Sequence, residues 1–175
     1  LNSSNSGFIK TVKTILKDIT FENINITNTA SGERTGVIAN VGAKVENVTI
    51  NHILVEAPKM NRVGFIGNST SESINNITMD TVEITGKTYI AGYAGYAESP
   101  VLRQLEAKNL KIQGTENYVA GIIGYLHKRI GYNAWYVTVS DSEVQGQDYV
   151  GGIFAWSSTG GNNPSPRYVS NFNSY

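Results

Sequence analysis

The sequence contains no cysteine, and it has only two histidines and four prolines among its 175 residues. The absence of cysteine excludes disulfide bonds and thiolate metal sites, but it does not fix the compartment, because many bacterial surface proteins also lack cysteine. The two histidines, His52 and His127, do not have the spacing of helical metal ligands. A zinc site is therefore not expected, and no cofactor is implied.

An excess of charge is also absent, since 14 basic side chains are balanced by 14 acidic ones. This balance argues against nucleic acid or an anionic membrane as the main partner. Apolar runs reach only about five residues, which predicts no transmembrane segment, and no signal peptide is visible. The chain begins at Leu1 and ends at Tyr175 within an unfinished pattern. We therefore expect residues 1–175 to be one domain and a piece of a larger protein.

Charged helix formers are scarce, whereas strand and turn formers are abundant. Charged residues make up 16% of the chain, and there are 18 glycines and 19 asparagines. This mixture favours strands and turns over helices. The hydrophobic content of 40% is sufficient to bury a core, so disorder is not expected.

A short motif, glycine followed by aliphatic or aromatic residues, occurs six times. Its leading glycines are separated by 29, 28, 28, 29 and 31 residues. Repetition at such a period is typical of solenoids. The motif lacks the lysine and the helix of a phosphate-binding loop, so crowding or tight bends explain the glycines better. The leading glycines are Gly7, Gly36, Gly64, Gly92, Gly121 and Gly152.

A second pattern keeps the same period, with apolar residues separated by steps of three, two, three and two. Its first copy is Leu16, Ile19, Phe21, Ile24 and Ile26. Steps of two place side chains on one face of a strand, and steps of three mark corners where the chain turns. The residues just before the fourth apolar position are mostly corner-forming types. They are Asn23, His52, Thr81, Asn109 and Asp141.

A repeat of this length without hairpin signals cannot close a sheet alone, but it can do so by stacking. Five or six buried aliphatic side chains per repeat contribute roughly 1.5–3 kcal/mol each, whereas ordering the backbone costs about 1–2 kcal/mol per residue. We therefore predict an all-β, right-handed parallel β-helix (β-solenoid) of about five to six coils, with 28 to 31 residues per coil. The rival, a β-sandwich, would not explain the glycine period.

Length variation falls between the repeated positions and indicates loops. Residues 1–6 are expected to be a frayed lead-in. Residues 126–133 and 157–166 are expected to protrude as loops on one flank of the solenoid. Residues 167–175, with Val169 and Phe172, look like the start of a further coil.

Two segments resemble the GLUG repeat of bacterial surface proteins. They are Tyr-Val-Ala-Gly-Ile-Ile-Gly at 118–124 and Tyr-Val-Gly-Gly-Ile-Phe-Ala at 149–155, and residues 19–26 also match the part of the repeat that precedes the glycine motif. The similarity extends roughly from Gly7 to Trp156. It is closest to the N-terminal repeats of immunoglobulin A1-protease-type zinc metallopeptidases of Gram-positive cocci. The resemblance implies a secreted or cell-surface, adhesin-like bacterial module associated with virulence. The His-Glu-x-x-His motif of the metallopeptidase is absent, so any such chemistry would lie outside this chain.

The candidate catalytic residues do not match the arrangement of a known type of active site. His52 occupies a corner position, which predicts a structural role, and His127 falls in a basic loop where we expect it to be solvated or at most an interaction point. Parallel β-helices often carry pairs of carboxylates, but Asp80 aligns with asparagine, lysine and serine, and no two aspartates share a column. No nucleophile elbow is present either. We therefore predict that the chain is not an enzyme.

Two sets of aromatic residues keep fixed offsets from the glycine motif, three residues before it and four residues after it. The first set is Tyr89, Tyr118 and Tyr149, and the second set is Tyr96, Tyr125 and Trp156. Stacked rings in neighbouring coils would stabilise each other. Alternatively, they would form a strip that binds sugar rings or a protein partner.

These observations favour a non-catalytic repeat module acting as a rigid spacer, an adhesive surface or a platform that positions a substrate. The expected partners are a host protein or glycan, or another domain of the same protein. The alternatives are a glycan-binding module and a carbohydrate-active β-helix enzyme, either a lyase or a glycosidase.

Overall fold

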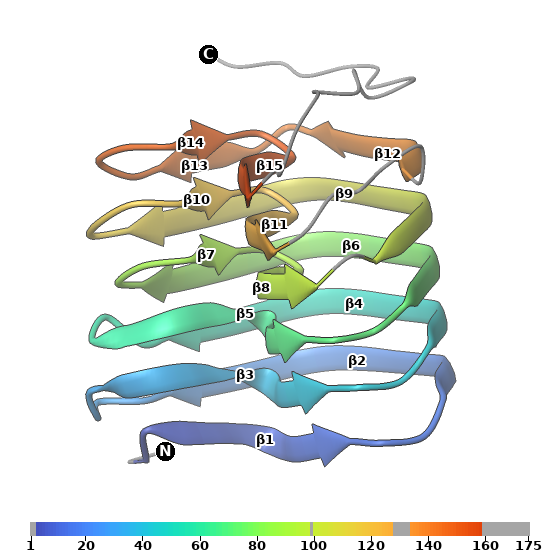
Figure 1. Cartoon of the computed structure of the whole chain (residues 1–175), viewed down its shortest axis with the longest axis horizontal. Coiled ribbons are helices and arrows are strands. Elements are labelled where there is room, and N and C mark those ends of the chain that lie inside the picture. The colour runs from blue at the N-terminus through green and yellow to red at the C-terminus, as the bar shows by residue number, and fades with distance from the viewer. Residues whose placement is uncertain (1–2, 99, 128–133, 159–175) are drawn as a thin grey trace.

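A computed structural model describes residues 3–98, 100–127 and 134–158 of the chain. In this part of the chain every regular element is a strand, and all paired strands run parallel. Successive windings stack as a β-solenoid of about five turns. The ribbon rises in a right-handed sense from β1 towards β14, as Figure 1 shows. The predicted fold is therefore confirmed.

One wall of the solenoid is a sheet of long strands that bend around the core, and we call it the bent sheet. Its central register pairs Ile53 with Ile24 on one side and with Val82 on the other, so each apolar position lies on its equivalent in the next coil. The strands of the bent sheet are β2 (Leu16–Thr27), β4 (Val45–Glu56), β6 (Ser73–Gly86), β9 (Val101–Gly114), β12 (Ala134–Ser140) and β13 (Glu143–Gln145).

The opposite wall carries the glycine motifs, and we call it the hooked sheet. Its N-terminal strands are continuous, whereas each later coil contributes two shorter strands separated by a bend. The strands of the hooked sheet are β1 (Asn5–Val12), β3 (Gly32–Val41), β5 (Met60–Ser69), β7 (Ile90–Ala91), β8 (Ala94–Glu98), β10 (Val119–Ala120), β11 (Ile123–His127), β14 (Val150–Gly151) and β15 (Phe154–Ser158).

The bent strands turn through residues with left-handed backbone. All five predicted corner residues, from Asn23 to Asp141, have φ between 48° and 55°. An equivalent corner lies at the first step of three in each repeat, where Asp18 and Tyr136 also have positive φ. The apolar pattern predicts two or three short strands in each repeat, separated at these corners. Instead β2, β4, β6 and β9 run through them, because parallel pairing continues on both sides of each corner.

The core lies between the two sheets and is built from the repeated apolar positions. Val48, Ile50 and Ile53 are at most 1% exposed, which confirms their inward assignment. At the N-terminal end some of the repeated apolar positions are exposed to solvent, since Phe8 is 71% exposed and Ile19 is 37% exposed. These side chains have a neighbouring coil on one side only.

Some predicted boundaries differ from the structure. β1 begins at Asn5, which pairs with Arg34, so the paired region starts inside the expected lead-in. Leu126 and His127 belong to β11 rather than to a loop, because Leu126 fills a core position. β15 extends to Ser158. The remaining loop and further-coil predictions, over 128–133 and 159–175, lie outside the described residues.

Candidate functional site

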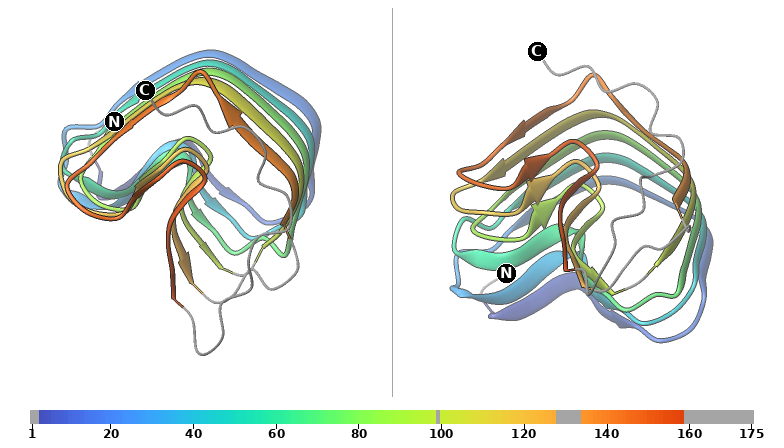
Figure 2. Two further views of the ribbon diagram at one scale, coloured as in Figure 1. Left: turned by 90° about the horizontal axis from the view of Figure 1, so that it is seen from above. Right: turned by 45° about the horizontal axis from the view of Figure 1, so that its top comes forward.

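The C-terminal coils share a sharp re-entrant turn between their two hooked-sheet strands, and we call this the inner bend (Figure 2). It contains β7 and β8, β10 and β11, and β14 and β15. The two arms of the bend approach closely, since a Cβ atom added at Gly124 would lie 2.8 Å from the carbonyl oxygen of Tyr118. Any residue larger than glycine would therefore force the arms apart.

The leading glycines stack on one another, as their period predicts. Gly36 pairs with both Gly7 and Gly64, and the amide of Gly92 donates to the carbonyl of Gly121 at 2.9 Å. A Cβ atom at Gly92 would lie 2.5 Å from that carbonyl oxygen. The glycine column is therefore explained by crowding between coils, which is a structural role.

The first aromatic column forms a continuous stack. The rings of Tyr89 and Tyr118 are 5.1 Å apart with 20° between their planes, and those of Tyr118 and Tyr149 are 4.9 Å apart with 5° between their planes. Each of these tyrosines has positive φ, between 54° and 64°. This backbone conformation places three rings in one column at the start of the inner bend.

The second aromatic column lies against the first, which sequence analysis did not anticipate. Tyr96 and Tyr125 stack at 5.6 Å, and Tyr125 also meets the ring edges of Tyr89 at 5.0 Å and Tyr118 at 5.6 Å. Trp156 packs edge-on against Tyr149 at 4.9 Å. The two predicted columns are therefore one interlocked group of six rings, which we call the aromatic array.

The packing of the aromatic array limits what it can bind. Tyr118 has a ring stacked on each of its faces, and Tyr89 has a ring stacked on one face, so little face remains in the middle of the array for a sugar to stack on. At the C-terminal end of the array, Tyr149 is 48% exposed and Trp156 is 39% exposed. The exposed surface of the aromatic array is therefore concentrated in that last coil.

The N-terminal coils fill the same two columns with arginine and asparagine. Arg34 pairs with Arg62 and Asn40 pairs with Asn68 across neighbouring strands. Within each coil the arginine donates to the asparagine, from Nη1 of Arg34 to Oδ1 of Asn40 at 2.6 Å and from Nη1 of Arg62 to Oδ1 of Asn68 at 3.2 Å. The columns thus change from polar and basic to aromatic along the axis.

The two halves of the columns meet at Arg62 and Tyr96. The Cζ atom of Arg62 lies 4.4 Å from the centroid of the Tyr96 ring, which is a cation–π arrangement. Burial and the negative charge of Glu98 raise the pKa of Tyr96, and the positive charge of Arg62 opposes this shift. His127 lies beside the same ring at 6.2 Å. His127 is therefore a neighbour of the aromatic array, which agrees better with the predicted interaction point than with a solvated loop residue.

The arginine column escaped detection from sequence because its offset differs. Val63 pairs with Ile90 and Ile66 pairs with Ala94, so the fourth coil has one extra residue between its two paired positions. Arg62 consequently precedes its glycine by two residues, whereas Tyr89 precedes its glycine by three. Aligning Val63 with Ile90, the residues that follow Arg62 and Tyr89, reveals the shared column, whereas aligning the glycines does not.

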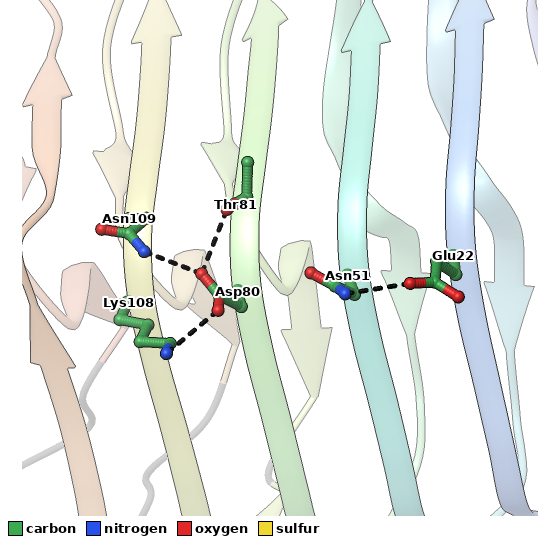
Figure 3. A network of polar contacts seen from close by, with 6 residues as sticks. All are labelled: Glu22, Asn51, Asp80, Thr81, Lys108 and Asn109. Carbon is green, nitrogen blue, oxygen red and sulfur yellow. Dashed lines mark hydrogen bonds and ion pairs between the residues drawn. The ribbon is translucent and has the colours of Figure 1, made fainter.

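Asp80 lies on the outer face of the bent sheet, away from the core. Asp80 accepts hydrogen bonds from Asn109 at 2.8 Å and Thr81 at 3.1 Å, and it forms an ion pair with Lys108 at 3.0 Å (Figure 3). The hydrogen bond from Asn109, followed by that from Lys108, lowers the pKa of Asp80. A general acid needs a raised pKa, so this environment does not suit Asp80 to that role.

The predicted alignment of Asp80 with Asn51, Lys108 and a serine is confirmed by the strand register. Glu22, which a comparison of aspartates alone leaves out, shares this column. Asn51 lies between the two acidic residues and donates to Glu22 at 3.2 Å. The two carboxylates are therefore separated by the amide of Asn51.

The described residues contain no cluster of three or more side chains suited to holding a metal ion. His52 lies at its corner with φ of 50°, which agrees with the predicted structural role. Nor does the described part of the chain include a helix long and apolar enough to cross a membrane.

Tyr93, in the fourth glycine motif, is a buried polar residue that sequence analysis did not single out. Its side chain is fully buried beside Phe65, and its hydroxyl group has no hydrogen-bond partner in the described structure. Burial strongly raises the pKa of Tyr93. The hydroxyl therefore stays protonated, and its desolvation is a cost to stability.

Comparison with known proteins adds no assignment. No family model matches the chain, and neither a curated protein nor a solved structure matches it.

Proposed function

We propose that this chain is a non-catalytic repeat module of a bacterial secreted or cell-surface protein. Its rigid stack of coils serves as a spacer, as an adhesive surface or as a platform that positions a substrate. The observation that carries the proposal is the unbroken register of the bent sheet. Ten residue pairs join β2 to β4, and ten more join β4 to β6. Such a stack resists bending because every coil is bonded to its neighbours along most of its length.

The aromatic array supports a structural role in the same stack. Its rings lie at the inner bend, and each ring contacts a ring from a neighbouring coil. These contacts tie successive inner bends together along the axis. The array thus extends the rigidity of the bent sheet to the hooked sheet.

The extracellular, bacterial setting is supported by the resemblance of the glycine motifs to GLUG repeats. By that resemblance, a zinc metallopeptidase domain would be attached outside this chain. The local chemistry agrees with a passive role, because Asp80 is engaged by Asn109 and Lys108.

Turnover assays test the non-catalytic part of the proposal. The purified chain is incubated with polygalacturonate, other acidic and neutral polysaccharides, and a protein substrate, and new reducing ends, unsaturated products and peptides are measured. We expect no turnover. Turnover that disappears in Asp80→Asn would contradict the proposal and establish the carbohydrate-active alternative.

A second candidate function is glycan binding at the C-terminal end of the aromatic array, where Tyr149 and Trp156 are exposed. A glycan-array signal without turnover that is lost in Trp156→Ala would support it. Tyr136→Ala is a suitable control, because Tyr136 is 72% exposed but lies on the bent sheet. Loss of the signal in both variants would argue against a specific site.

A further inference from the structure

We propose that the arginine and asparagine columns at the N-terminal half of the hooked sheet form an anion-binding site for the carboxylate or sulfate groups of an acidic polysaccharide. This inference goes beyond the spacer role and does not depend on it. It begins from Arg34 and Arg62, which occupy equivalent positions in adjacent coils.

Arg34 and Arg62 place two positive charges at neighbouring positions of the hooked sheet. Paired positions in adjacent strands lie about 4.8 Å apart, so the two positive charges repel each other. Among the described residues, no carboxylate lies within ion-pair distance of Arg34 or Arg62. The negative charge of Glu98 acts on the neighbouring Tyr96, whose pKa it raises. An anion bound between the two arginines would remove the repulsion.

The arginines also have hydrogen-bond donors to spare. A guanidinium group carries five N–H donors, and each arginine donates one hydrogen bond, to Asn40 or to Asn68. The Nε atom of Arg34 has no partner in the described structure but is buried, so a ligand would use the remaining Nη donors. Carboxylate and sulfate oxygens accept bidentate, charge-assisted hydrogen bonds from such groups.

The geometry of the arginines is fixed in advance of binding. The amide oxygens of Asn40 and Asn68 hold one nitrogen of each guanidinium group, and the ring of Tyr96 supports that of Arg62 at 4.4 Å. Side chains held in place lose less conformational entropy when a ligand binds. The contacts with the two asparagines and with Tyr96 therefore orient the N–H donors of the arginines.

A polysaccharide fits the surroundings better than a small anion. A depression of about 470 Å³ adjoins the asparagine column, and its polar lining comprises Thr11, Lys13, Asn40, Asn68 and Thr70. Hydroxyl, amide and ammonium groups of this kind match sugar hydroxyls as well as anionic substituents. The columns run parallel to the axis, so a linear polymer with repeated acidic groups can lie along them.

Calorimetric titration with four defined probes tests the proposal: hexagalacturonate as the carboxylate source, a heparin hexasaccharide as the sulfate source, maltohexaose as the neutral sugar and hexaglutamate as the acidic peptide. We expect one or both acidic saccharides to bind, with weaker binding at higher salt. Maltohexaose should not bind measurably. The probe that binds distinguishes the carboxylate source from the sulfate source.

The decisive variant is Arg34→Gln combined with Arg62→Gln, which should weaken binding at least tenfold. Arg103→Gln is the matched control, because Arg103 lies over the Trp135 ring at 4.9 Å on the bent sheet. We expect that control to stay within twofold of the unmodified chain. If the double variant melts early, Arg62→Lys keeps the charge while removing the planar fork, and it should weaken binding at an unchanged melting temperature.

Three results would overturn the proposal. They are the absence of binding by both acidic saccharides, equal loss in Arg103→Gln and in the double variant, and tighter binding of hexaglutamate than of either saccharide. Turnover is measured separately, so a failure of the anion site leaves the spacer proposal intact, and the reverse also holds.

Discussion

The ring of Tyr118 lies parallel to the ring of Tyr149 in the next coil, with 5° between the planes and 4.9 Å between the centroids. On its other face Tyr118 stacks on Tyr89, and its edges meet Tyr125 and Trp156. Tyr118 is therefore the centre of the aromatic array, and it joins both arms of the inner bend in three coils. Its contribution to stability can be measured separately from any contribution to binding.

Replacing Tyr118 with alanine should destabilise the chain by about 1–3 kcal/mol, because several ring pairs, each contributing about 0.5–1.5 kcal/mol, are lost. Tyr136→Ala is the control, since Tyr136 has similar φ, 55° against 64°, but is 72% exposed. Denaturant unfolding of both variants gives the comparison. Equal free energies of unfolding would show that the array does not stabilise the inner bend.

Replacing Tyr93 with phenylalanine should stabilise the chain by about 1 kcal/mol, because a buried hydroxyl group without a partner is removed while the ring is kept. For a chain of this size, the melting temperature should rise by about 2–4 °C. Tyr136→Phe, at an exposed position, should leave it unchanged. A lower melting temperature in Tyr93→Phe would mean that the hydroxyl group has a partner in solution.

The fold and its glycine and corner positions could be predicted from sequence because they depend on repetition within one coil. A residue such as Asn109 or His52 recurs at a fixed place in the apolar pattern, and its left-handed backbone follows from the corner. The first corner follows the same rule in the early coils, since Asp18, Asn47 and Asn76 tolerate left-handed backbone. In the later coils Gln104 and Tyr136 do not share this preference, and only the step of three in the apolar pattern indicates the corner.

The candidate site was less predictable because it depends on contacts between separate parts of a coil. The fixed offsets of Tyr89 and Tyr96 predicted two columns, but their convergence results from the path of the inner bend. The extra residue in the fourth coil hid the alignment of Arg62 with Tyr89. Sequence periodicity alone does not report either relationship.

Replacing Thr81 with asparagine should raise stability by up to about 1 kcal/mol, because a β-branched residue with φ of 55° is strained, whereas asparagine tolerates this conformation. Thr78→Asn is the matched control, as Thr78 is exposed on the same strand with ordinary strand backbone. We expect that change to be neutral or slightly destabilising. The two melting temperatures test whether the corner geometry is correct, and a fall in Thr81→Asn would contradict it.

Replacing Ile53 with aspartate should unfold the chain, because an unpaired charge would enter a column of apolar side chains. The same result is expected for Ile84→Asp. Leu54→Asp is the adjacent control, since Leu54 points to the opposite face of β4 and is only partly buried. Circular dichroism distinguishes the variants, and a native melting temperature in Ile53→Asp would show that the inward assignment is wrong.

The most direct test of the rigid stack is the distance between spin labels at Thr20 and Thr138. Strand register places Thr20, Thr49, Thr78, Glu106 and Thr138 in one outer column of the bent sheet. Four coil steps of about 4.8 Å predict a backbone separation of about 19 Å, and pulsed electron resonance should give a single narrow distribution near that value. A broad distribution, or one centred far from it, would contradict a rigid solenoid with one coil per repeat.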